Sequence, residues 1–189
     1  MPKAENKQII AVDIDEVIFP TVVDLIDYVD REHSVKMTME DFATYHLEDV
    51  WPGGPEEGAE IIKAYIKQVP VEIAPIKGAA EALAKLSERY ELIIMTARDP
   101  AASVKTQEWL SRHFPEQFKD THFVGNRHDS KTWRSKAEVC KELGVTYLID
   151  DLLTTVLDAN EAGVKALLFG DYPWNRAETL PDGVTRVKD

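Results

Sequence analysis

The stretch QIIAVDID, residues 8–15, decides the fold of this chain. Residues 8–14 are rich in β-branched side chains and predict a strand of the core. Asp13 and Asp15 come at its end, where the chain turns and both carboxylates can converge on one point. Carboxylates that end a buried strand are costly unless a cation or a reaction needs them. The pair therefore favours a functional site, although two aspartates that cap a helix or stabilise a loop would give the same pattern.

The rest of the chain alternates short apolar runs with helical patterns. This alternation is typical of a parallel sheet covered by helices. Further strands are predicted over residues 92–96, 122–124, 146–149 and 164–169, and helices over 79–90, 101–114, 135–143 and 152–162. The sequence thus predicts an α/β fold in three layers, with a Rossmann-like parallel sheet in the middle.

Residues 20–75 interrupt this alternation. Apolar side chains recur at helical spacing over residues 22–29 and 62–69, and a short helix is expected from Thr38. A helical insertion is therefore predicted directly after the first strand, at the edge where open parallel sheets bind ligands. The expected division is a core of residues 1–19 and 76–189 and a small helical cap of residues 20–75.

Composition and charge limit the functions that the chain can have. With 189 residues, 44% of them hydrophobic and 30% charged, it has the composition of one globular domain, or of one domain with a modest insertion. No apolar run is long enough to span a bilayer and no secretory signal is visible, so we expect a cytoplasmic protein without a membrane partner. Cys140 is the single cysteine, which excludes an internal disulfide and a cysteine-based zinc site. The net charge of −12 argues against binding to duplex nucleic acid.

A second acidic pair, Asp150 and Asp151, follows the strand predicted over residues 146–149. Either residue could instead cap the helix that comes next. Two adjacent parallel strands that each end in paired acids would put four carboxylates in one crevice. Such a cluster needs a divalent cation, and ligands that are all oxygen select a hard cation such as Mg²⁺. We therefore expect a Mg²⁺ site formed by this pair together with Asp13 and Asp15.

Two further segments could hold a phosphate beside these acids. Thr96-Ala97-Arg98 ends the second predicted strand, where a hydroxyl and backbone N–H groups suit a phosphate oxygen. Lys136 opens a predicted helix just upstream of the acidic pair, where its ammonium could offset negative charge. Both have an ordinary alternative, because strand-end threonines commonly bond their own backbone and helical lysines are usually solvated. Lys131 is a rival to Lys136.

Taken in order, Asp13-x-Asp15, Thr96, Lys136 and Asp150-Asp151 resemble the four motifs of the haloacid dehalogenase-like (HAD) superfamily. The resemblance covers the whole chain, with the insertion in the place of the superfamily's cap. Within the superfamily, the chain looks most like the 5′(3′)-deoxyribonucleotidase group and its bacterial nucleotidase-like relatives. The segments that carry this narrower resemblance are TAR at 96–98, SKAE at 135–138, LIDD at 148–151 and PWN at 173–175. One departure is Glu16, because phosphatases of the superfamily commonly have glycine there.

The resemblance implies a Mg²⁺-dependent phosphomonoesterase that works through an aspartyl-phosphate intermediate. Asp13 would be the nucleophile, and Asp15 would protonate the leaving group and then activate water. Superfamily dehalogenases lack the second acid, since a halide leaves without a proton, so Asp15 favours a phosphatase. Mg²⁺ would be held by the four acids, with Asp15 using its backbone carbonyl. The phosphate would be bound by Thr96, Ala97, Arg98 and Lys136.

The cap is expected to select the substrate. In the resembling nucleotidases cap aromatics stack on the base. The aromatics in or at the edge of this insertion are Phe19, Phe42, Tyr45 and Trp51, and the last three are the candidates here. Trp51 is favoured because it lies in a turn rich in Pro and Gly, yet all three rings could equally form the cap's own core. Asn175, after the fifth strand, could bond a sugar or a base edge, or belong to a surface turn. No metal-ligand spacing links the histidines, which are His33, His46, His113, His122 and His128.

The substrate expected from the resemblance is a (deoxy)nucleoside monophosphate. A phosphatase of a sugar phosphate, or of another small metabolite, is an alternative with the same chemistry. A signalling module that accepts phosphate on an aspartate is a further alternative, but such modules need no cap and do not carry the acceptor on their first strand, where Asp13 lies. A relative that binds phosphate without turnover is another, which the complete set of motif residues argues against. A homodimer is compatible with the sequence, which does not specify the oligomeric state.

Overall fold

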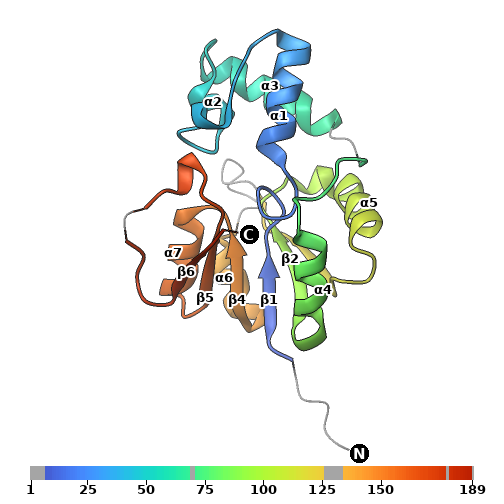
Figure 1. The fold of residues 1–189 in the computed structure, drawn as a ribbon, viewed down its shortest axis with the longest axis vertical. Helices are drawn as coiled ribbons and strands as arrows, with labels where there is room; N and C mark the ends of the chain where they lie inside the picture. The colour runs from blue at the N-terminus through green and yellow to red at the C-terminus, as the bar shows by residue number, and fades with distance from the viewer. Residues whose placement is uncertain (1–6, 69–70, 126–133, 178, 189) are drawn as a thin grey trace, which may run out of the picture.

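The computed structural model describes residues 7–68, 71–125, 134–177 and 179–188 (Figure 1). One parallel sheet forms the middle of the molecule, with the strand order β3-β2-β1-β4-β5-β6. The strands are β1 (Ile9–Val12), β2 (Glu91–Thr96), β3 (Asp120–Phe123), β4 (Val145–Asp150), β5 (Lys165–Phe169) and β6 (Val184–Val187). The predicted α/β fold is confirmed, and each of the five predicted strands is present.

Helices cover both faces of the sheet. On one face pack α4 (Ala79–Arg89) and α5 (Ser103–His113), which follows the 3₁₀ helix η2 (Pro100–Ala102). On the other face pack α6 (Lys136–Leu143) and α7 (Leu153–Glu161). Successive side chains of a strand point to opposite faces, so Ile10 and Val12 join the first apolar cluster while Ala11 joins the second. In the described part of the chain, no helix combines the length and the apolar character that a membrane crossing needs.

The edge strand β6 is absent from the sequence-based prediction. It has four residues, reads Val-Thr-Arg-Val and pairs in parallel with β5. Val184 is buried and Thr185 is exposed, so one face of this strand contributes to the core. A segment this short that contains a charged residue gives too weak a pattern to separate a strand from a loop.

The chain between β1 and α4 forms a helical unit beyond the carboxyl ends of the strands (Figure 1). Its helices are α1 (Thr21–His33), η1 (Met39–Asp41), α2 (Leu47–Val50) and α3 (Pro55–Gln68). The helix expected from Thr38 is the single turn η1, which Asp41 stabilises by accepting the Thr38 N–H at 2.7 Å. The unit has its own buried apolar cluster. This cluster supports the division into a core (1–19 and 76–189) and a cap (20–75), which we retain as a proposal.

A tight turn connects β1 to α1. The carbonyl of Ile14 accepts hydrogen bonds from the N–H groups of residues 17–19 at 2.8–3.3 Å. Glu16 has a φ of 56°, in the left-handed region that favours glycine. Its buried carboxylate accepts the N–H of Val22 at 3.0 and 3.1 Å. Glu16 thus forms the turn without glycine and caps the first turn of α1.

Candidate active site

Three buried carboxylates meet at the carboxyl ends of β1 and β4. Asp13 follows β1, Asp150 ends β4, and Asp151 comes next. One oxygen from each carboxylate lies within 4.8 Å of the other two, and the residues are 5%, 0% and 1% exposed. Pairing of the two strands continues past β1, since the N–H of Asp13 donates to the carbonyl of Ile149 at 2.9 Å. The parallel register therefore brings these three acids together.

Lys136 places an ammonium group against this cluster. Ser135 caps α6 by accepting the N–H of Glu138 at 3.1 Å, so Lys136 is the first helical residue. The buried ammonium lies 2.8 Å from a carboxylate oxygen of Asp13 and 2.7 Å from one of Asp150. Burial disfavours the charged form, but the two acids outweigh it and raise the pKa of Lys136. Lys136 is thus a buried partner of the acids, whereas its rival Lys131 lies outside the described residues.

Negative charge stays in excess at the cluster despite Lys136. Burial, with the charges of Asp150 and Asp15, outweighs the effect of Lys136 and raises the pKa of Asp13 to about 7. Burial and the charges of Asp150 and Asp13 likewise raise the pKa of Asp151. Protons or a cation would relieve this excess, and carboxylates are the hard oxygen donors that Mg²⁺ prefers. The donor set of the three acids therefore fits Mg²⁺.

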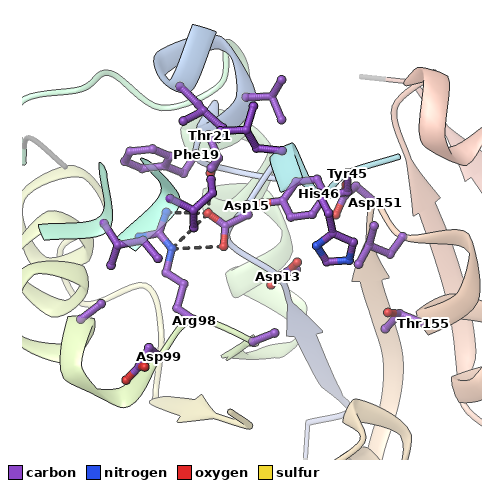
Figure 2. Close-up of a pocket in the computed structure, with 18 of the residues that line it drawn as sticks. Asp13, Asp15, Phe19, Thr21, Tyr45, His46, Arg98, Asp99, Asp151 and Thr155 are labelled. Carbon is purple, nitrogen blue, oxygen red and sulfur yellow. Dashed lines mark hydrogen bonds and ion pairs between the residues drawn. The ribbon is translucent and has the colours of Figure 1, made fainter. Parts of the chain in front are cut away.

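Asp15 is engaged with Arg98 (Figure 2). The Arg98 guanidinium donates to both oxygens of the carboxylate at 2.7–3.1 Å, and the Thr21 hydroxyl donates to one of them. The guanidinium carbon lies 4.6 Å from the centre of the Phe19 ring. Burial raises the pKa of Asp15, but Arg98 and Thr21 outweigh it and hold the pKa below its usual value. Arg98, expected to bind phosphate, is therefore paired here with Asp15, which is held as an anion.

The end of β2 lies beside the acids. Thr96 is fully buried, and its hydroxyl accepts the backbone N–H of Arg98 at 3.2 Å. This local bond is the ordinary alternative for a strand-end threonine. Ala97 and Arg98 line the cavity at the site. A phosphate contact from Thr96 stays a prediction.

A cavity of about 700 Å³ extends from Asp13 and Asp15 to the cap. Small-molecule sites commonly have volumes of ~300–1,000 Å³, so the cavity is large enough for a phosphorylated metabolite. Tyr45 and His46 line it from the cap and lie near Asp151 (Figure 2). Tyr45 meets Trp174 edge to face, with ring centres 5.6 Å apart. The wall nearest Asp151 is thus built from both core and cap.

Phe42 and Trp51 are placed differently from Tyr45. Phe42 is 0% exposed and Trp51 is 6% exposed, and both belong to the apolar cluster of the cap. Of the three candidates, Tyr45 lines the cavity and Phe42 and Trp51 do not. Other aromatic side chains also line it, namely Phe19, Tyr65, Trp109 and Trp174. The position of Phe42 and Trp51 fits the packing alternative, whereas Tyr45 packs against the edge of the same cluster and also lines the cavity.

Asp151 is contacted by the segment after β5. The amide of the buried Asn175 donates to the backbone carbonyls of Asp151 and Phe169, at 2.9 Å each, and its oxygen accepts the Arg186 guanidinium at 2.9 Å. These bonds hold the Asn175 side chain against the protein's own backbone and Arg186. A contact with a sugar or a base would require it to face the cavity instead. The indole N–H of Trp174 donates to the Asp151 carboxylate at 2.7 Å. The PWN segment draws attention to Trp174 in the sequence, but the sequence does not indicate that its side chain contacts Asp151.

A charged residue of this segment contacts the cap. Arg176, which follows Asn175, donates to both oxygens of Glu40 in η1 at 2.8 and 2.9 Å. This exposed ion pair joins the segment after β5 to the cap. His128, to which the sequence assigns no role, lies outside the described residues.

Comparison with known proteins supports the arrangement. Residues 7–132 match the profile of the family described as 5′ nucleotidase, deoxy (pyrimidine), cytosolic type C protein. No curated protein matches the sequence. A haloacid dehalogenase-like family hydrolase from Streptococcus pneumoniae has a similar structure, with a TM-score of 0.66 and 18% identity over 96% of this chain and 94% of that chain.

Two further solved structures have the same fold. A HAD-superfamily hydrolase of subfamily IA from Geobacter sulfurreducens gives a TM-score of 0.62 and 19% identity, covering 97% of this chain and 94% of that chain. YfnB from Bacillus subtilis, a HAD hydrolase solved with bound magnesium, gives a TM-score of 0.60 and 14% identity, covering 87% of this chain and 89% of that chain.

The family profile and the fold cover complementary parts of the site. The profile spans the acids after β1, the cap and the end of β2, while the structural similarity extends over Lys136 and the acids of β4. The profile matches more than half of the chain. The chain therefore belongs to the cytosolic type C 5′(deoxy)nucleotidase family of HAD-like hydrolases, which makes it a phosphatase.

Proposed function

We propose that the chain is a Mg²⁺-dependent phosphomonoesterase that hydrolyses (deoxy)nucleoside monophosphates in the cytoplasm. The observation that carries this proposal is the buried cluster of Asp13, Asp150 and Asp151, with Lys136 beside it at the cavity. These three acids and the backbone carbonyl of Asp15 would hold Mg²⁺. When bound, Mg²⁺ would offset the charge of the carboxylates and of the substrate phosphate.

Hydrolysis would proceed in two displacements at phosphorus. The Asp13 carboxylate attacks the phosphorus, and the bond from phosphorus to the ester oxygen breaks while Asp15 donates a proton to the leaving alkoxide. Asp15 then takes a proton from water, which attacks the aspartyl phosphate to release inorganic phosphate and restore Asp13. Lys136, with Thr96 and the N–H near Ala97, would stabilise the charge that shifts among the phosphate oxygens. The ion pair with Arg98 favours the anionic form of Asp15, which the second displacement needs, whereas the first displacement needs Asp15 to carry a proton.

Nucleotide specificity would come from the wall near Asp151. The family profile favours a nucleotide, and Tyr45 presents an aromatic ring at the cavity. A nucleobase that stacks on this ring would leave its phosphate directed toward the acids. A sugar phosphate has no planar base that could stack on this ring.

The test compares nucleoside monophosphates, sugar phosphates and p-nitrophenyl phosphate as substrates of wild-type enzyme and Tyr45→Ala. Base stacking is worth roughly 1–3 kcal/mol, so Tyr45→Ala should lower kcat/KM for the preferred nucleotide by about 5- to 150-fold. Its kcat/KM for p-nitrophenyl phosphate should change much less. Phe42→Ala is the matched control, because it opens a hole in the cap's core and should affect both substrates alike. An unchanged substrate ratio in Tyr45→Ala, or a preference for sugar phosphates, would favour the small-metabolite alternative.

A further inference from the structure

One aromatic side chain, Trp174, contacts both a carboxylate of the acidic cluster and the cap. Its indole N–H donates to Asp151 Oδ2 at 2.7 Å, and Asp151 is 1% exposed. The indole ring packs against the apolar cluster of the cap and lines the cavity. Asp151 thus receives a donor that has no acceptor function and no charge.

Neighbouring groups fix the indole in this position. The ring of Tyr172 stacks on it with centres 4.8 Å apart and an angle of 8° between the planes, and the Tyr172 hydroxyl donates to the carbonyl of Glu16 at 2.9 Å. Asn175, the next residue in the chain, is anchored to the backbone of Asp151. From the cap, Tyr45 meets the ring edge to face. The direction of the N–H is therefore set by core and cap together.

The carboxylate that receives this bond needs orienting. Asp151 lies among like charges, from which an unrestrained carboxylate would turn away. A bond to Oδ2 fixes the plane of the carboxylate and leaves Oδ1 for another partner. Groups that orient metal ligands in this way typically change metal affinity by about 10- to 100-fold when they are lost.

We propose that Trp174 is a positioning residue that holds Asp151 in the orientation required for a divalent cation. The inference rests on the metal site of the proposed function and adds a residue outside the superfamily motifs. It also gives the cap an influence on the cation site, since Tyr45 packs on the indole that holds Asp151.

The main experiment is Mg²⁺ titration of the full chain by calorimetry, without substrate. Trp174→Phe keeps an aromatic ring for stacking but removes the N–H, and it should raise the Mg²⁺ dissociation constant by about 10- to 100-fold. Trp109→Phe is the matched control, because its indole N–H donates to the carbonyl of Ile73 at 2.8 Å, away from the acids. This control should lower the melting temperature and leave the Mg²⁺ dissociation constant unchanged. A Trp174→Phe protein that binds Mg²⁺ as tightly as wild type would overturn the proposal while leaving the proposed function intact.

A second measurement follows Mg²⁺ binding to the wild-type chain and does not need Trp174→Phe to fold. The chain has four tryptophans, so ¹⁵N-labelled indole groups give four N–H signals, which substitution of the other three tryptophans assigns. The Trp174 signal should shift during Mg²⁺ titration with the same dissociation constant as the calorimetry. A Trp174 signal that stays fixed while Mg²⁺ binds would contradict the positioning role. If wild-type protein binds no Mg²⁺ at all, the metal site of the proposed function is wrong, and the positioning role of Trp174 is wrong with it.

Discussion

At the scale of single residues, Asp13 is the proposed nucleophile and also a buried acid that lies among like charges. Its carboxylate is buried beside Asp150 and Asp151, and its pKa is raised to about 7. Asp13→Asn replaces it by an amide of the same shape that is not a nucleophile and carries no charge. We expect phosphate release to fall to background, while the melting temperature measured in EDTA stays equal or rises by a few degrees because repulsion is relieved. Appreciable hydrolysis by a folded Asp13→Asn protein would show that another group attacks phosphorus.

Loss of the Asp15 carboxyl should slow the first displacement less for an activated leaving group than for a natural one. Asp15→Asn removes the group proposed to serve as acid and then as base, so turnover of a nucleotide should fall by ~10²–10⁴-fold. p-Nitrophenolate leaves with less need of a proton, so the first displacement should suffer less with that ester. Rapid-mixing kinetics should then show a burst of p-nitrophenol. Equal losses on both substrates without a burst would contradict the acid role.

At the scale of elements, α1 begins on an unusual cap. The Glu16 carboxylate accepts the N–H of Val22 while its backbone has a positive φ. Glu16→Ala loses the cap and keeps the backbone strain, whereas Glu16→Gly loses the cap but relieves the strain, each effect being about 1 kcal/mol. Thermal unfolding should therefore place Glu16→Ala lowest, with Glu16→Gly roughly 2–4 °C above it and close to wild type. The reverse order of the variants would mean that the turn stores no strain at Glu16.

The elements that the sequence predicts best are those whose pattern is set by burial. The central strands are buried on both faces, so their apolar runs stand out between helical patterns. By contrast α2 and β6 have four residues each, and their formation depends on neighbours that the local sequence does not specify. The acids after β1 and β4 were predictable for a related reason, because the ends of adjacent parallel strands must meet.

Contacts between distant loops were not predictable in the same way. The bond from Trp174 to Asp151 depends on how the segment after β5 folds back, and periodicity carries no information about that. Similarly, Phe42 and Tyr45 lie three residues apart in the cap, yet Phe42 is buried in its core while Tyr45 packs at the edge of that core and lines the cavity. Their residue types are alike, so the difference comes from the path of the chain between η1 and α2.

At the scale of the whole molecule, the raised pKa values make stability depend on pH and metal together. The pKa of Asp13 rises from 3.8 to about 7 and that of Glu16 from 4.5 to about 8, each chiefly through burial. Between about pH 4 and pH 8 the folded chain holds protons that the unfolded chain has lost, so the free energy of unfolding falls as pH rises. The lowered pKa of Asp15 acts in the opposite sense, and only below the ordinary aspartate pKa of 3.8.

The metal-free protein should consequently melt at a lower temperature at pH 8 than at pH 5. In the proposed site Mg²⁺ would replace protons at Asp13, so the rise in melting temperature on adding Mg²⁺ should be larger at pH 8. Differential scanning calorimetry in EDTA and in Mg²⁺ would measure both effects. An Asp13→Asn, Glu16→Gln double variant should show a flatter pH dependence in EDTA. A metal-free melting temperature that rises from pH 5 to pH 8 would contradict the assigned protonation states.

The place of β1 at the centre of the sheet has a consequence for synthesis on the ribosome. Ile9 pairs with Glu91, which is made 82 residues later, and with Val145, which is made later still. At translation rates of ~5–20 residues per second, the apolar β1 waits roughly 4–16 seconds for its first neighbour. The cap is translated in that interval and has an apolar cluster of its own, so it can fold while the nascent strand is still exposed. Chaperones that recognise extended apolar segments would therefore find their main target in β1 during this interval.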